Sequence, residues 1–148
     1  MKTLTMFINN QTEHLTHSST YEVVENQLIE AKTFNNLTFA GSLFSLSVFK
    51  NVTFESCTFY GGRWENCTFV GCKFVNCNFQ FFTAIHNKFN AVVFENSMWL
   101  TSSLRQNEID FSFLDFKTLY YVGQNSNSIQ SCSRSDESNI IKNNSSAA

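Results

Sequence analysis

The stretch that decides the fold is residues 52–79, VTFESCTFYGGRWENCTFVGCKFVNCNF, in which every fifth residue from Phe54 onward is aromatic. The same register extends in both directions. Of the 18 positions spaced by five from Phe34 to Leu119, 17 hold a large apolar residue, and Ala84 is the exception. Eleven of the 17 Phe residues occupy this register. The sequence is therefore an internal repeat with a unit of five residues.

A second class of positions lies two residues before each bulky one and holds small side chains. Twelve of these positions are filled by Ser, Val, Cys or Gly: Ser42, Ser47, Val52, Cys57, Gly62, Cys67, Cys72, Cys77, Val92, Ser97, Ser102 and Ser112. The small residue and the following aromatic residue are two apart, so on a strand they share one face. The unit thus consists of a small residue, a variable one, a bulky apolar one and two more variable ones.

A period of five excludes the two common regular structures. On an α-helix, at about 100° per residue, successive Phe side chains would be rotated by about 140° and would form no single face. On a flat strand, residues five apart point to opposite sides, which would expose half of the aromatic rings. Both problems disappear if the chain bends once per unit. The repeat therefore predicts short strands joined by corners, stacked as a coil with every aromatic ring pointing inward.

These residues resemble the pentapeptide-repeat family. The resemblance covers about Phe34 to Leu119 and rests on many consecutive units. It implies an all-β fold, a right-handed quadrilateral parallel β-helix with four pentapeptides per coil. The chain departs from the family's typical unit, which has Ala, then Asn or Asp, then Leu or Phe. Here the small position prefers Cys or Ser, the next position is often Thr, and the bulky position is usually Phe.

A coil of four units requires residues 20 apart to stack in columns, and the sequence agrees. One predicted column contains Phe54, Phe74, Phe94 and Leu114, and the other three are equally apolar except at Ala84. At Ala84 the preceding small position holds Phe82, so large and small residues exchange places and roughly conserve the core volume. About four regular coils are predicted from Phe39 to Leu114. The predicted division is an N-terminal cap at 1–32, the β-helix at 33–121 and a flexible polar tail at 122–148.

Composition limits the class of protein and its compartment. Ten Lys and Arg against 12 Asp and Glu give a formal net charge of −2, which excludes a strongly basic or strongly acidic chain. No apolar run approaches the roughly 20 residues that span a bilayer, and the first ten residues lack the apolar core of a signal peptide. We expect a cytoplasmic protein with no membrane association and reduced cysteines, and delivery by a signal-less secretion route stays open.

The repeat cysteines have two interpretations. Cys57, Cys67, Cys72 and Cys77 could supply thiolates to a zinc ion, which requires them to converge on one polar centre. Alternatively, Cys serves as the small core residue of the unit and alternates there with Ser and Val. We favour the second interpretation because the predicted coil places Cys67, Cys72 and Cys77 on three successive faces. No metal site is therefore predicted.

Other chemically interesting residues are also assigned to the surface. The three histidines, His14, His17 and His86, are expected to be solvated. Glu95 and Asp115 are 20 apart and could form an acid pair, but a carboxylate pair without a cleft is more often a solvated face. The sequence has no nucleophile motif and no phosphate-binding glycine loop. We therefore predict no catalytic or cofactor-binding residue, no cofactor, and a protein that is not an enzyme.

The most informative surface feature is apolar. Eight residues near the end of the repeat fall outside the inward register: Val93, Met98, Leu100, Phe111, Phe113, Phe116, Tyr120 and Tyr121. Such a patch suggests a surface that binds a partner protein or a second copy of the chain as a homodimer. A terminal segment or a cap helix folding back over it is the alternative.

The repeat suggests two functions, and a third alternative, an enzyme or a metal-binding protein, would need a convergent polar site that the sequence does not show. The first is a non-enzymatic protein-binding scaffold, for which the resemblance also suggests a bacterial immunity or effector role. The second is the best-known activity of the family, protection of DNA gyrase, a type II topoisomerase, by mimicking DNA. Between Phe34 and Leu119 there are six acidic and six basic residues, whereas a duplex carries dense negative charge. The scaffold is therefore the favoured function, and direct nucleic-acid binding is not expected.

Overall fold

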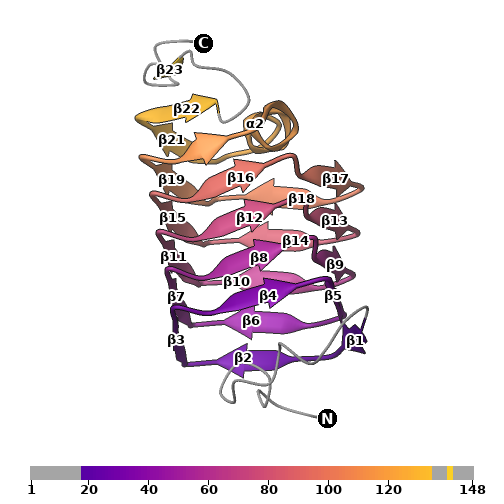
Figure 1. Ribbon diagram of the computed structural model, residues 1–148. Helices are drawn as coiled ribbons and strands as arrows, with labels where there is room; N and C mark the ends of the chain where they lie inside the picture. Colours follow the sequence, from indigo (N-terminus) through magenta and orange to yellow (C-terminus); the bar gives the residue numbers. More distant parts are fainter. Residues whose placement is uncertain (1–17, 135–139, 142–148) are drawn as a thin grey trace.

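The computed structural model describes residues 18–134 and 140–141, which form an all-β parallel solenoid (Figure 1). Four sheets of five, five, six and seven strands surround one core, which corresponds to about six turns of chain. Between β1 and β20 each strand pairs with the strand four further along the chain, as the four-unit coil predicted. Every pairing among the described residues is parallel except that of β22 with β23. The described helix is too short to cross a membrane.

Sheets A and B form two neighbouring faces. Sheet A contains β1 (Ser18–Thr20), β5 (Leu37–Ala40), β9 (Thr58–Tyr60), β13 (Asn78–Gln80) and β17 (Met98–Leu100). Sheet B contains β2 (Val23–Glu25), β6 (Leu43–Ser45), β10 (Arg63–Glu65), β14 (Thr83–Ile85) and β18 (Ser103–Arg105). Because each strand has only three or four residues, the faces are narrow and the corners are frequent.

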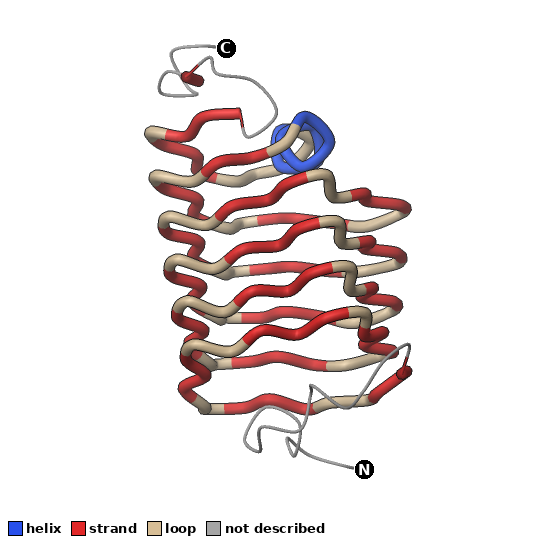
Figure 2. Tube along the Cα trace, in the orientation of Figure 1, coloured by secondary structure: helices blue, strands red, loops and turns tan. Residues whose placement is uncertain are grey.

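Sheets C and D complete the coil. Sheet C contains β3 (Leu28–Glu30), β7 (Val48–Lys50), β11 (Thr68–Val70), β15 (Lys88–Asn90), β19 (Glu108–Asp110) and β21 (Ser128–Gln130). Sheet D contains β4 (Thr33–Asn35), β8 (Thr53–Glu55), β12 (Lys73–Val75), β16 (Val93–Glu95), β20 (Phe113–Leu114), β22 (Cys132–Arg134) and β23 (Ile140–Ile141). The helix α2 (Phe116–Gly123) interrupts the coil after β20 (Figure 2).

The corners explain how a five-residue unit closes the coil. Every fifth residue from Asn26 to Phe111, and again Ser131, has a positive φ between 49° and 67°. Nine of these 19 residues are Asn or Gly, the residue types that adopt this left-handed conformation at least cost. Corner amides donate to the next coil, as Asn36 N does to Glu55 O at 3.0 Å. One left-handed residue per unit thus turns each short strand into the next face.

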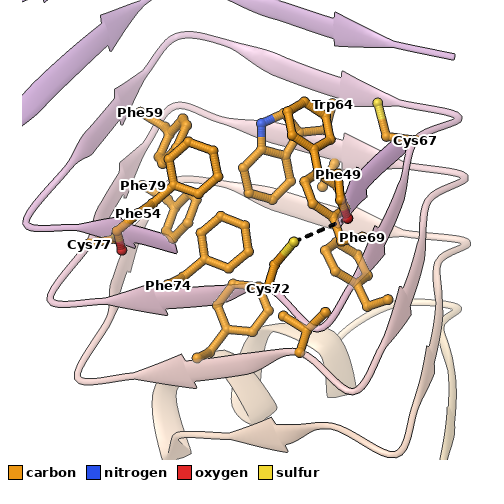
Figure 3. Close-up of a cluster of buried hydrophobic side chains, with 14 of the residues drawn as sticks. Phe49, Phe54, Phe59, Trp64, Cys67, Phe69, Cys72, Phe74, Cys77 and Phe79 are labelled. Atoms are coloured by element: carbon orange, nitrogen blue, oxygen red, sulfur yellow. Dashed lines mark hydrogen bonds between the residues drawn. The ribbon is translucent and has the colours of Figure 1, made fainter. Parts of the chain in front are cut away.

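The aromatic columns lie in the core as the sequence predicted (Figure 3). Phe74 is fully buried and stacks between Phe54 and Phe94, with ring centroids 5.1 and 4.8 Å apart. The neighbouring column behaves in the same way, with Phe59 and Phe79 stacked at 5.1 Å. In both columns each ring stacks on at least one other ring, and the columns form one continuous hydrophobic core.

The exchange of large and small residues at Ala84 is also present. Phe82 and Ala84 are both buried, and the Phe82 ring lies 4.8 Å from Trp64, edge to face. Gly62 occupies the matching small position one coil earlier. A Cβ at Gly62 would lie 2.6 Å from the Ser42 carbonyl oxygen and 3.3 Å from the Phe82 ring. The extra ring of Phe82 therefore fits because its neighbour in the preceding coil is glycine.

The small positions also supply hydrogen bonds across the coils. The Cys72 thiol donates to the Phe49 carbonyl at 3.2 Å (Figure 3), and the Cys77 thiol donates to that of Phe54 at 3.3 Å. The Ser97 hydroxyl makes the equivalent bond to Phe74 O at 3.4 Å. This explains why Cys and Ser alternate there: each is small and carries one donor that reaches a backbone carbonyl of the preceding coil.

At one corner the small position holds a ladder of asparagines. Asn87, Asn107 and Asn127 stack through side-chain amides, with Nδ2 to Oδ1 distances of 3.1 and 2.9 Å. Each amide also donates to a carbonyl of the preceding coil, at Trp64, Ala84 and Leu104 respectively. Asn127 thereby continues the coil beyond α2.

The coil extends beyond the range 33–121 that the repeat predicted, and beyond four turns. Strands β2 and β3 lie within the expected N-terminal cap, yet they pair with β6 and β7 of the coil. They do so because Val24 and Ile29 keep the inward register. Strands β21 and β22 continue sheets C and D within the expected tail, where Ile129 and Cys132 are buried. The remaining parts of the expected cap and tail, 1–17, 135–139 and 142–148, lie outside the described residues.

Candidate functional site

Helix α2 sits at the C-terminal end of the coil, where it packs against β17, β18 and β20 (Figure 1). Its N-cap is Asp115, whose carboxylate accepts from Thr118 N and from Ser97 N, both at 2.8 Å. Trp99 Nε1 donates to Thr118 Oγ1 at 2.8 Å. These three hydrogen bonds fix the first turn of α2 to the coil beneath it.

The other end of α2 is held in the same manner. Asn127 Nδ2 donates to the Val122 carbonyl at 2.9 Å, and Val122 itself is buried. Thr118 and Val122, four residues apart, therefore form the face that packs on the coil. The opposite face carries Phe116 and Tyr120, which are 55% and 56% exposed. A helix fastened at both ends thus presents two aromatic side chains to solvent.

Beside this aromatic face, α2 and sheets A and D enclose a groove. One part has a volume of about 320 Å³ and is lined by Trp99, Phe116, Lys117, Tyr120 and Tyr121. The adjoining part has a volume of about 490 Å³ and is lined by Glu95, Asn96, Ser97, Met98, Asp115, Phe116 and Lys117. Phe116 and Lys117 line both parts, so the two lie next to each other. We call these residues together the α2 groove.

The structure divides the eight predicted surface residues into groups. Met98, Phe116, Tyr120 and Tyr121 line the α2 groove. Val93 and Phe113 are partners in the pairing of β16 with β20, on sheet D. Two residues stand apart from these: Phe111 is at the corner between sheets C and D, and Leu100 is at the end of β17.

Exposure also differs among the eight residues. Six are exposed, whereas Val93 and Tyr121 are partly buried. The Tyr121 ring packs on Trp99 at 6.0 Å and contacts the hydrophobic core. The inward register predicts Leu119 as its last position, but this residue lies in α2 and is only partly buried. The repeat therefore gives way to the helix before its last predicted unit.

A second exposed apolar group was missed by the sequence analysis. Tyr60 and Phe81 lie at the edge between sheets A and B, with ring centroids 5.6 Å apart. Leu100 continues the outward column of Tyr60 through Gln80 in the register of sheet A. The signal was available, because Tyr60 and Leu100 are 40 residues apart, which is two coils, and neither is in the inward register.

Phe111 occupies a corner that favours asparagine or glycine, and its replacement should stabilise the protein. Its φ is 52° and its side chain is 62% exposed, so the ring contributes little packing while the backbone carries a left-handed cost. We expect Phe111→Asn to raise the free energy of unfolding by about 0.5–1 kcal/mol, measured by urea denaturation. Phe111→Ala keeps the unfavourable corner, so an equal gain in that control would contradict this explanation.

The cysteines and histidines occupy places that fit structural roles. Burial raises the pKa of the Cys57, Cys67 and Cys72 thiols to about 11 and shifts that of Cys77 still further upward. Within the described part of the chain, no three His, Cys, Asp or Glu side chains are grouped so that they could hold a metal ion. His86 is exposed at a corner with φ 59°, and His14 and His17 lie outside the described residues.

Asp115 requires a correction. It was expected to lie with Glu95 on a solvated face, but only Glu95 is exposed there, whereas Asp115 is 4% exposed. The reason is the helix: at the point where the coil would turn onto sheet A, Asp115 caps α2 and turns its carboxylate inward to Ser97 N and Thr118 N. Both of its oxygens accept hydrogen bonds from the backbone, so its role is structural.

No protein-family model and no curated protein matches the sequence. Among solved structures, the chain is similar to two trypsin-treated variants of QnrB1, described as a plasmid-mediated fluoroquinolone resistance protein. The first has a TM-score of 0.46 and 14% identity over 78% of this chain, and the second has a TM-score of 0.37 and 11% identity over 66%. The chain spans 66% and 57% of the lengths of those two proteins. At these values the likeness is no basis for a function or a partner.

Proposed function

We propose that this protein is a non-enzymatic scaffold that binds another protein through its C-terminal surface. The observation that carries the proposal is the outward face of α2. In a helix that only capped the coil, the apolar side chains would be expected to face inward. Here Phe116 and Tyr120 face solvent, next to the exposed Met98 of β17.

The rigidity of the site supports the same function. Hydrogen bonds fix α2 to the coil through Asp115, Thr118 and Val122, so the helix that carries the exposed rings is held in place before a partner arrives. A segment that is ordered in advance loses less conformational entropy on binding. Exposed aromatic residues are also the type most enriched at the centres of protein interfaces.

Replacing the two exposed aromatic residues of α2 with glutamate should abolish partner binding without unfolding the protein. In Phe116→Glu/Tyr120→Glu the exposed face becomes charged, whereas the packed residues Thr118 and Val122 are unchanged. The tagged full chain would be used to capture proteins from extracts of its source cells, and its own mass would be measured by light scattering. We expect at least a tenfold loss of one captured protein, with the melting temperature within a few degrees of the wild type.

Leu28→Glu is the matched control. Leu28 is equally exposed, but it lies on β3 at the opposite end of the coil, so this variant should capture the same protein as the wild type. If the double variant retains both the captured protein and the mass of the wild type, the proposed function is wrong. If the double variant changes only the mass, the surface joins two copies of the chain.

A further inference from the structure

We propose that the α2 groove recognises a short peptide segment in which a bulky apolar side chain stands next to a carboxylate. This inference rests on the proposed function and specifies the chemistry of the partner. The apolar side chain would enter the part of the groove lined by Trp99, Phe116, Tyr120 and Tyr121. Its volume of about 320 Å³ is at the lower end of the range for ligand pockets and is enough for one bulky side chain.

Positive charge beside the aromatic part favours a peptide that carries an acidic residue next to its anchoring side chain. Lys117 is exposed, lines both parts of the groove and forms no ion pair with any residue that the structure describes. The guanidinium carbon of Arg134 lies 5.0 Å from the centroid of the Phe116 ring, a cation–π contact beside the aromatic part. Among the residues that the structure describes, no carboxylate lines the aromatic part. A carboxylate beside the anchoring side chain would therefore meet positive charge.

The adjoining part of the groove gives the segment a direction. Glu95 is exposed there and forms no ion pair within the described chain, while the Asp115 carboxylate is already occupied by backbone amides. A second carboxylate near Glu95 would be repelled, and a basic or neutral residue would be accepted. The bound segment thus places its acidic residue beside Lys117 in the aromatic part and its uncharged or basic part near Glu95.

The same pair of charges favours a peptide over a nucleic acid. Aromatic rings beside a cation can also stack bases and hold phosphates. A nucleic-acid strand, however, carries a negative charge at every nucleotide, so a strand that crossed the whole groove would place a phosphate near Glu95. A peptide can match both ends, because its charges are placed residue by residue.

The test uses the full chain and three blocked hexapeptides, SGDFGS, SGNFGS and SGKFGS, followed by the NMR signal of the Trp99 indole N–H. This group donates to Thr118 on α2 and so reports on the aromatic part of the groove. We expect the Asp peptide to bind about fivefold more tightly than the Lys peptide, with the Asn peptide between them, since an exposed ion pair changes affinity by roughly this factor. Lys117→Glu should reverse the order.

The control variant is Lys73→Glu, which makes the same charge change at an exposed residue of β12 on sheet D. It should leave the order of the three peptides unchanged. The inference is overturned if no peptide moves the Trp99 signal, if all three bind equally, or if an oligo-dT strand moves it at lower concentration than the Asp peptide. It is equally overturned if Lys73→Glu reverses the order as Lys117→Glu does.

These outcomes separate the inference from the proposed function. Equal peptide binding, combined with partner capture that is lost in Phe116→Glu/Tyr120→Glu, would overturn only the acidic preference. Charge-dependent peptide binding, combined with partner capture that the same double variant leaves intact, would overturn the proposed function while the groove chemistry stands. Each result therefore bears on one of the two statements.

Discussion

Phe74→Ala is expected to lower the free energy of unfolding by about 3–5 kcal/mol, a large share of the 5–15 kcal/mol typical of a domain. Phe74 is fully buried and stacks on Phe54 and on Phe94, so its removal leaves a cavity between two rings. The coil cannot collapse to fill this cavity, because strands β8, β12 and β16 are held at fixed spacing by their backbone hydrogen bonds. Urea denaturation followed by circular dichroism would measure the change.

Phe113→Ala serves as the control for this experiment. Phe113 is on the same sheet but is about half exposed, so its truncation should change stability by no more than about 0.5 kcal/mol. If the two variants lose equal stability, the stacked columns do not dominate the energetics of the fold. A loss below 1 kcal/mol in Phe74→Ala would lead to the same conclusion.

Alkaline pH is expected to unfold the protein through its buried thiols. Burial raises the pKa of Cys57, Cys67 and Cys72 from 9.0 to about 11 in the folded state. Between these values the unfolded chain has lost its thiol protons while the folded chain still holds them, so stability falls as the pH rises. Below about pH 8 the thiols are protonated in both states and contribute no pH dependence.

The loss of stability at alkaline pH can be calculated from the difference between the folded and unfolded pKa values of the thiols. Two pKa units correspond to roughly 2–3 kcal/mol for each of the three thiols at pH 11, which together approach the whole stability of a domain. Urea midpoints measured from pH 7 to pH 11 should fall steeply above pH 9. In a variant with Ser at all three positions the fall should be much shallower, because Ser keeps the donor and does not titrate. An unchanged pH profile in that variant would contradict the explanation.

The inward register made the coil predictable from the sequence. Because a buried aromatic residue recurs at every fifth position, one observation specified the strand length, the columns 20 residues apart and even the exchange at Ala84. The structure adds the reason for the corners, which the sequence also carried: asparagine or glycine stands at about half of the left-handed positions, as at Asn36 and Gly41.

The end of the coil was less predictable, because α2 breaks the repeat. The repeat register continues through Leu114 and Leu119, so the inward pattern has no interruption there. What replaces the next coil is a helix whose start depends on the Asp115 carboxylate and on a contact with Ser97, 18 residues earlier. A contact between residues so far apart is tertiary and has no local signature.

The apolar surface was predicted in composition but not in arrangement. Positions outside the inward register identified Met98, Phe116 and Tyr120 as exposed. Their assembly into one groove depends on the direction in which α2 crosses the end of sheets A and D. For the same reason Tyr121, adjacent to Tyr120, turned out to pack on Trp99.

The fit of Phe82 against Gly62 has a consequence for how the chain reaches its native state. Since most coils offer nearly identical aromatic columns, a strand could pair one whole turn out of step and still bury its rings, and such slippage is a characteristic kinetic trap of repetitive chains. Displacement by one turn would set Phe82 against Ser42 instead of Gly62, and a Cβ at the glycine position would lie only 3.3 Å from the Phe82 ring, which is closer than ordinary van der Waals contact. The pair of Phe82 and Gly62 therefore favours the native alignment of the strands over alignments that are shifted by one turn.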